Sequence, residues 1–139
     1  MDYEPWPLPA SFWEHRALRA IAPEVWSGPL PADGAGFEVL APRDPWSAVP
    51  ARAYVYILGG MGQLDILYVG KTVDLPTRMS SHRCSTPWWS PSGHLTLLTV
   101  WGEDRPVAEA AALHLEAVAI HHLRPIWNVV GRQDRRIPA

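Results

Sequence analysis

The chain has 139 residues, with a single cysteine and no run of about 18 apolar residues that could cross a bilayer. Cys84 cannot form an internal disulfide, which favours a reducing compartment. The first residues, MDYEPWPLP, lack the basic start and apolar run of a signal peptide. We therefore expect a cytoplasmic protein without a membrane segment.

The chain also lacks net positive charge, since the formal charge is −2 at pH 7. Proteins that bind a phosphate backbone usually present basic surface, so nucleic-acid binding here would depend on local clusters. The basic residues gather in a first group and in a tail: Lys71, Arg78, His82 and Arg83, then Arg132, Arg135 and Arg136. The tail arginines are either part of a basic patch or a solvated end. No zinc-ligand spacing and no internal repeat are present.

The length fits one domain with a modest core. We expect an N-terminal arm over residues 1–50, a main domain over 51–131 and a basic tail over 132–139. Within the arm, one helix is predicted over residues 11–22, with Ser11 as N-cap and Glu14 at the capping-box position. Proline, glycine and aspartate between Pro23 and Pro50 indicate a loop. The arm could wrap the sheet, clamp a substrate or form a dimer contact.

The main domain starts with YVYILGGMGQLDILYVG, which reads as two strands around a glycine-rich turn. Alternation places Tyr54, Tyr56 and Leu58 on one face of the first strand and Val55 and Ile57 on the other. In the second strand Ile66, Tyr68 and Gly70 oppose Leu67 and Val69. A hairpin would bring Tyr56 and Tyr68 onto one face.

A helix is predicted directly after this hairpin. Thr72 or Asp74 is the candidate N-cap, and Pro76 lies in the first turn. Arg78 and His82 are four residues apart, so they share the helix face that should pack toward the sheet. Gly70, where the chain leaves the second strand, has no side chain to block the approach of a ligand.

A further strand and a long helix follow. The segment HLTLLTVW, residues 94–101, is expected to be a central strand, and Asp104 can cap a helix that runs to about His122. Glu116 shares a helix stripe with Glu109, Leu113, Ile120 and Leu123. It is either an acid embedded in apolar surface, which is costly unless a cation is bound, or a partly exposed glutamate at the rim.

A tryptophan pair and a histidine pair stand out beside the charged residues. Trp88 and Trp89 in STPWWSPSG could stack on a base or a sugar, or fill a core. His121 and His122 are adjacent and point about 100° apart on a helix, so we read them as structural or surface residues rather than as a metal pair.

The elements YVY, YVG and KTxxLxxR, a histidine one turn later, Glu116 on a later helix and Asn128 in RPIWN occur in this order. Over roughly residues 53–130 this arrangement resembles the GIY-YIG nuclease superfamily, and it is most similar to the restriction-endonuclease branch. Tyr54 stands where the first motif usually has glycine, and Val69 replaces isoleucine. The resemblance implies an α+β fold with a three-stranded antiparallel sheet flanked by helices.

The resemblance also implies a catalytic set: Tyr56, Tyr68, Lys71, Arg78, His82, Glu116 and Asn128. Tyr56 is the expected general base, its pKa lowered by Lys71, Arg78 or the metal, while Tyr68 orients water or phosphate. Arg78 would stabilise the charged transition state, and His82 would position the tyrosine or assist proton transfer. Asn128 would bond near the phosphate or hold the local loop.

Glu116 is the expected anchor for Mg²⁺ or Mn²⁺, together with phosphate oxygens and waters. Nucleic-acid contacts are expected from Lys71, Arg83, Trp88 and Trp89. The predicted function is a divalent-metal-dependent, restriction-like endonuclease that hydrolyses phosphodiester bonds, most simply of duplex DNA. It could act as a homodimer that reads a short symmetric site or as a weakly specific, structure-dependent nuclease. The alternatives are a non-cleaving nucleic-acid-binding or regulatory module, and an RNA or single-strand nuclease.

Overall fold

The computed structural model describes residues 8, 10–43, 50–60, 66–86, 89 and 92–128. The elements, in chain order, are α1 (Ala10–Trp13), α2 (Arg16–Ile21), β1 (Glu24–Pro29), α3 (Gly34–Leu40), β2 (Ala51–Gly59), β3 (Ile66–Thr72), α4 (Leu75–Ser85), β4 (His94–Gly102) and α5 (Arg105–Leu123). The sheet has the order β1-β4-β2-β3, and every pairing is antiparallel. The predicted α+β class with an antiparallel sheet is confirmed.

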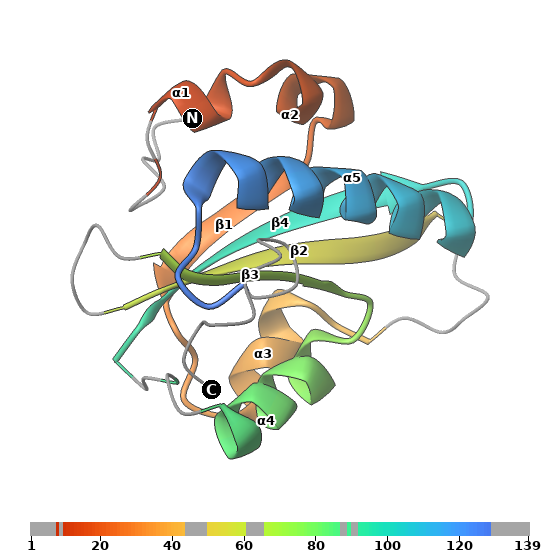
Figure 1. The fold of residues 1–139 in the computed structure, drawn as a ribbon. Helices are drawn as coiled ribbons and strands as arrows, with labels where there is room; N and C mark the ends of the chain where they lie inside the picture. Colours follow the sequence, from red (N-terminus) through yellow and green to blue (C-terminus); the bar gives the residue numbers. More distant parts are fainter. Residues whose placement is uncertain are drawn as a thin grey trace.

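The sheet lies between two layers of helices (Figure 1). Helices α1, α2 and α5 cover one face, where an aliphatic core gathers around Val55, Ile57, Leu98 and Leu115. Helices α3 and α4 cover the other face, whose core contains Tyr54 and Tyr56. No helix in the described ranges is both long enough and apolar enough to span a membrane.

The predicted hairpin of β2 and β3 is confirmed, with Tyr56 opposite Gly70 and Leu58 opposite Tyr68. The next pair joins Gly59 to Ile66, so Leu67 is an extra residue on β3. This irregularity is the reason that the predicted position of Ile66 is wrong: Ile66 packs in the aliphatic core with Val69, not on the face of Tyr68. A bulge shifts the alternation of side chains by one residue.

The predicted loop between Pro23 and Pro50 is wrong in its first half, because this part of the arm contains a strand and a helix. Strand β1 pairs with β4 and makes the sheet four-stranded instead of three-stranded. It is an edge strand, where Gly28 and the terminal Pro29 are tolerated. Asp33 caps α3 through a bond from the Gly36 N–H, 3.1 Å. Residues 44–49 lie outside the described ranges.

The helix predicted over residues 11–22 is two short helices. Helix α1 ends at Trp13, and His15 caps α2 by accepting a bond from the Ala17 N–H at 3.1 Å. A side chain that caps a helix lies outside its regular turns, so a continuous helix through residue 15 is excluded. Helix α2 ends at Ile21, and its C-cap Ala22 has a left-handed φ of 52°.

The later elements agree with the sequence. Asp74 caps α4 and Asp104 caps α5, each accepting a bond from the N–H three residues on, and β4 is a central strand as predicted. The face of α5 that packs on the sheet is small and apolar, with its buried residues Ala108, Ala112, Leu115 and Ala119. The stripe of Glu116 includes exposed Leu113, and Glu116 itself is partly buried, which matches the alternative of a partly exposed glutamate at the rim.

Candidate active site

The Tyr56 hydroxyl is the centre of a buried polar cluster between β2 and α4. Tyr56 is 0% exposed, and its oxygen lies 2.8 Å from His82 Nε2. Arg78 Nε donates a second hydrogen bond to the same oxygen, at 3.0 Å. Because a buried hydroxyl is costly without partners, these two bonds are what make the position tolerable. They also hold Arg78, an exposed residue, in a defined orientation.

Tyr68 lies beside this cluster. Its ring stacks on that of Tyr56, with centroids 6.0 Å apart and planes inclined by 30°, and meets the His82 ring edge-on at 5.0 Å. Unlike Tyr56, Tyr68 is only partly buried. The structure therefore confirms that the two tyrosines share one face, and it gives them different access to solvent.

Gly70 has a different role from the one predicted. It pairs with Tyr56 across the hairpin, and a Cβ at this position would lie 2.9 Å from Tyr68 Cε2 and closer still to the Tyr56 phenol. The space above Gly70 is thus filled by the two tyrosine rings rather than open to a ligand. A side chain here would displace a phenol whose bonds to Arg78 and His82 leave it little freedom.

The pKa of Tyr56 is shifted in the direction opposite to the predicted one. Burial raises the pKa of Tyr56 well above its ordinary value, and the charges of Tyr68 and Glu116 add to this, while Arg78 lowers it only in part. Burial also lowers the pKa of His82 to about 4, with Arg78 contributing. At pH 7 both Tyr56 and His82 are neutral, so they form a neutral hydrogen-bonded pair.

Glu116 interacts with this cluster from α5. Burial raises the pKa of its carboxyl group, and the charges of Lys71 and Arg78 lower it. Lys71 is exposed on β3, a strand that α5 contacts. Glu116, Lys71, Arg78 and Tyr56 are therefore electrostatically coupled although they belong to four different elements.

The donor set fits a magnesium-type ion. No group of three or more His, Cys, Asp or Glu side chains is assembled within the part of the chain that the structure describes. A half-buried carboxylate with a raised pKa would nevertheless gain from an adjacent cation, and Mg²⁺ commonly binds one or two carboxylates and keeps several waters. Glu116 could hold such an ion together with oxygens of a substrate phosphate.

Asn128 is 5% exposed and holds the edge strand. Its Oδ1 accepts a bond from the Val69 N–H at 2.7 Å, and its Nδ2 donates to the Val69 carbonyl at 2.6 Å. The N–H groups of Ile126 and Trp127 bond to the carbonyls of Ile66 and Leu67. Of the two predicted roles, this geometry matches the holding of local structure.

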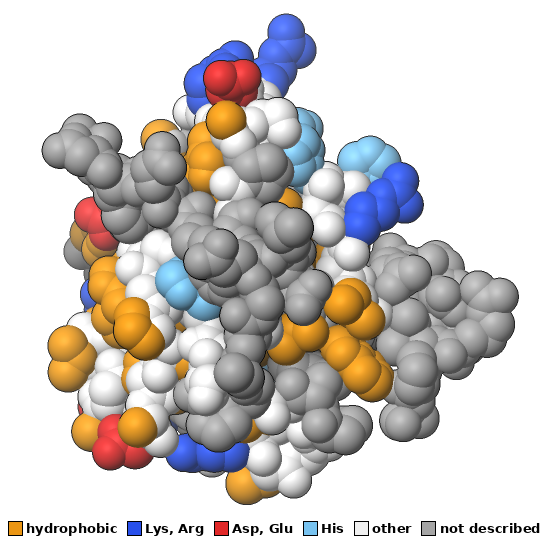
Figure 2. Space-filling view, turned by 90° about the vertical axis from the view of Figure 1, so that its left-hand side faces the viewer, with side chains coloured by type: hydrophobic (Ala, Val, Ile, Leu, Met, Phe, Trp, Pro, Cys, Tyr) orange, Lys and Arg blue, Asp and Glu red, His pale blue; other side chains and the backbone are white. Residues whose placement is uncertain are grey.

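The predicted nucleic-acid contacts are placed only in part. Arg83 is exposed and donates from Nη1 to the Ala32 carbonyl at 3.0 Å. Trp89 packs against the core on the α3 and α4 side, whereas Trp88 and the tail arginines lie outside the described residues. On the face that Figure 2 shows, described Lys and Arg side chains lie in separate small groups and not in one basic patch.

Arg43, which the sequence reasoning missed, joins the arm to α4. It donates to the Asp74 carboxylate at 3.1 Å and to Thr77 Oγ1 at 3.2 Å, and it pairs with Glu38 of α3 at 3.3 Å. No short-range pattern could have revealed this, because Arg43 and Asp74 are 31 residues apart.

No family model matches the chain, and no solved structure matches it. The chain is similar to UvrABC system protein C of three bacteria. The identity is 37% over 93 residues for Nitrosomonas europaea, covering 65% of this chain. It is 35% over 125 residues for Rhodopseudomonas palustris, covering 83%, and 33% over 132 residues for Sphingopyxis alaskensis, covering 94%.

The chain spans only 15%, 16% and 20% of the length of these relatives. The similarity supports the resemblance to the GIY-YIG superfamily, with which the observed fold is compatible, and gives no support to the restriction-endonuclease branch.

Proposed function

We propose that this chain is a GIY-YIG-type endonuclease domain that hydrolyses DNA phosphodiester bonds with a divalent metal ion. The observation that carries the proposal is the bond from Arg78 to the buried Tyr56 hydroxyl, which His82 holds from the other side. This bond fixes an exposed guanidinium whose charge, like that of Lys71, acts on the half-buried Glu116 carboxylate. The similarity to UvrABC system protein C supports the same reading.

Each residue has a distinct task in this proposal. Bound Mg²⁺ or Mn²⁺ would polarise a phosphoryl oxygen and lower the pKa of a coordinated water. Glu116 would hold the ion. Arg78 would stabilise the charge that builds on the phosphoryl oxygens, since a guanidinium carries five N–H donors and the Tyr56 bond uses one. Lys71 would contact the phosphate, and Asn128 would keep β3 in place.

The proposed roles of the tyrosines are the reverse of the sequence-based assignment. A general base has to meet the attacking water and accept its proton. Tyr56 is fully buried, its oxygen is engaged by two partners, and burial raises its pKa. We assign Tyr56 to positioning Arg78 and His82, and we assign the partly buried Tyr68 to the attacking water.

The proposal stops short of a restriction enzyme. The similarity to the relatives gives no support to that branch, so reading of a short symmetric site by a homodimer is not part of the proposal. Duplex DNA remains the proposed substrate, and cleavage of single-stranded DNA or RNA is an outcome that the experiment below would reveal.

The test is a cleavage panel with duplex DNA, single-stranded DNA and RNA, in Mg²⁺, in Mn²⁺ and in EDTA. The wild type should cut duplex DNA only with metal, and Glu116→Gln should lower the rate by a factor of about 10³. Glu109→Gln is the matched control, since it makes the same change at an exposed position on the same helix. A similar thermal melting curve for all three proteins would show that folding is unaffected.

Two outcomes would contradict the proposal. Cleavage by Glu116→Gln at a near wild-type rate would remove the metal assignment. Failure of the wild type to cut any of the three substrates in either metal would leave the non-cleaving nucleic-acid-binding module as the better reading.

A further inference from the structure

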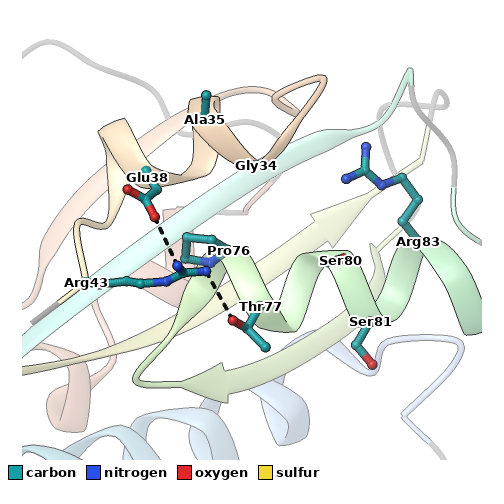
Figure 3. A pocket seen from close by; sticks show the side chains of 9 residues that line it. All are labelled: Gly34, Ala35, Glu38, Arg43, Pro76, Thr77, Ser80, Ser81 and Arg83. Carbon is teal, nitrogen blue, oxygen red and sulfur yellow. Dashed lines mark hydrogen bonds and ion pairs between the residues drawn. The ribbon is translucent and has the colours of Figure 1, made fainter.

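A groove of about 730 Å³ separates α3 of the arm from α4 of the main domain. Figure 3 shows Arg43 at one end of it, bridging to Glu38 and Thr77, and Arg83 at the other end. The residues that line it are Gly34, Ala35, Glu38, Arg43, Pro76, Thr77, Ser80, Ser81 and Arg83. The groove lies outside the Tyr56 cluster described above.

The lining offers hydrogen-bond donors and a small positive charge. Ser80 and Ser81 present two hydroxyl groups from exposed positions of α4, whereas the Thr77 hydroxyl donates to Asp74 and accepts from Arg43. Two arginines against one glutamate give the lining a formal charge of +1, in a chain whose total is −2. Glu38 is already paired with Arg43, so its negative charge is offset and repels an anionic ligand less.

Helix α4 connects this groove to the candidate active site. Arg78 and His82 extend from one side of α4 toward Tyr56, while Ser80 and Arg83 line the groove on another side. A helix is about 10–12 Å across with its side chains. The groove and the Arg78 guanidinium are therefore about one helix width apart, close enough for one nucleic-acid molecule to contact both.

We propose that the groove between α3 and α4 binds the sugar–phosphate backbone of the DNA substrate next to the cleaved phosphate. This rests on the proposed nuclease function and extends it, because it makes the arm part of the substrate-binding surface. Arg83 and the hydroxyl groups contact phosphate oxygens, and Arg43 fixes the distance between the two helices by bonding to both.

The first test compares two arginines. Arg83 and Arg19 are both exposed, and each donates to a backbone carbonyl, but Arg19 lies on α2 over the opposite face of the sheet. Binding of a labelled DNA duplex is measured in EDTA by fluorescence anisotropy over a series of salt concentrations. Arg83→Gln should raise Kd about five-fold and reduce the salt slope by about one, and Arg19→Gln should change neither.

A second pair of variants introduces a negative charge instead of removing a positive one. Ser81→Glu places a carboxylate in the groove, and Ala110→Glu makes the same change in net charge at an exposed position of α5. Ser81→Glu should weaken DNA binding about five-fold or more. Ala110→Glu should bind as the wild type does.

Equal Kd values for Arg83→Gln and Arg19→Gln, together with equal values for the two glutamate variants, would overturn the proposal. Loss of kcat with unchanged Kd would also overturn it, since the groove would then act on α4 and not on DNA. Selective loss of binding in a protein that cuts no substrate would uphold the groove and refute the nuclease function, so the two failures are distinguishable.

Discussion

The two faces of the sheet differ in the kind of side chain that β2 buries on them. On the α5 face, Val55 and Ile57 pack against alanines and Leu115, and the contacts are aliphatic. On the α4 face, Tyr56 packs against His82 and Met79, and its hydroxyl is hydrogen-bonded. One strand thus supplies an apolar core on one side and a polar cluster on the other.

The two faces therefore differ in role: the α5 face serves mainly stability, whereas the α4 face holds residues of the candidate active site. The alanines of α5 let the helix lie close to the sheet, so that face contributes mainly by removing apolar surface from water. The α4 face buries polar groups, which contribute little net stability even when they are bonded. Their hydrogen bonds instead hold side chains in one orientation, as the Tyr56 hydroxyl does for Arg78. The predictions below test this division, beginning with the largest expected effect.

Tyr68→Phe should give the largest loss of activity. If Tyr68 serves the attacking water, removing its hydroxyl should lower the single-turnover rate by a factor of about 10²–10⁴. Tyr56→Phe should lower the rate less, but it should cost about 1–3 kcal/mol of unfolding free energy because Arg78 and His82 lose a buried partner. Single-turnover cleavage and urea denaturation of both variants are the measurements. A reversed order of rates would restore Tyr56 as the base.

Arg78→Lys should lower kcat by a factor of about 10²–10³ while Kd for DNA changes little. Lysine keeps the charge but has no planar fork, and it cannot donate to Tyr56 from the Nε position. Arg105→Lys is the control on α5, since Arg105 is paired with Glu109 away from the cluster. If affinity and kcat fell by the same factor, Arg78 would contribute to DNA binding and not specifically to the transition state.

Leu115→Ala tests the aliphatic face. Leu115 is fully buried, and its truncation should cost about 2–5 kcal/mol of unfolding free energy through lost apolar contact and a residual cavity. At temperatures where the variant is still folded, its cleavage rate should match that of the wild type. A marked loss of rate in the folded variant would show that the two faces are not independent.

His82 should make stability depend on pH. Its pKa is about 4 in the folded protein and 6.5 for the ordinary group, so between these values the unfolded chain binds a proton that the native protein does not. Stability should therefore fall as pH is lowered from 7 to 4, by on the order of 1–3 kcal/mol. His82→Gln should show a shallower dependence in urea denaturation across this range. Burial also lowers the pKa of His94, but His94 is present in both proteins, so its contribution cancels in the comparison. Equal slopes of stability against pH in the wild type and in His82→Gln would contradict the prediction.

Tyr54→Phe should have the smallest effect. Tyr54 lies two residues before Tyr56 and is equally buried, but within the described part of the chain its hydroxyl has no hydrogen-bond partner. Removing an unpaired buried hydroxyl should change the unfolding free energy by less than about 0.5 kcal/mol, or raise it. Calorimetry of Tyr54→Phe beside Tyr56→Phe measures the contrast, and a loss as large as that of Tyr56→Phe would point to a partner of Tyr54.

Features that depend on near neighbours were predictable from the sequence. The alternation in YVYIL separates Tyr56 from Val55 because a strand has a period of two residues, and Asp74 and Asp104 cap α4 and α5 because the bonds they accept come from three residues away. The association of two tyrosines, an arginine and a histidine followed from the hairpin and from the four-residue spacing in α4.

Other features were decided only by the tertiary structure. Strand β1 forms because β4 offers an edge far along the chain, and Leu67 is an extra residue because the hairpin register shifts. The raised pKa of Tyr56, the space that Gly70 leaves for two rings and the link from Arg43 to α4 depend on which side chains meet and how much water they exclude. Local pattern sets backbone conformation over a few residues, whereas burial and hydrogen-bond partners are set by contacts between residues tens of positions apart.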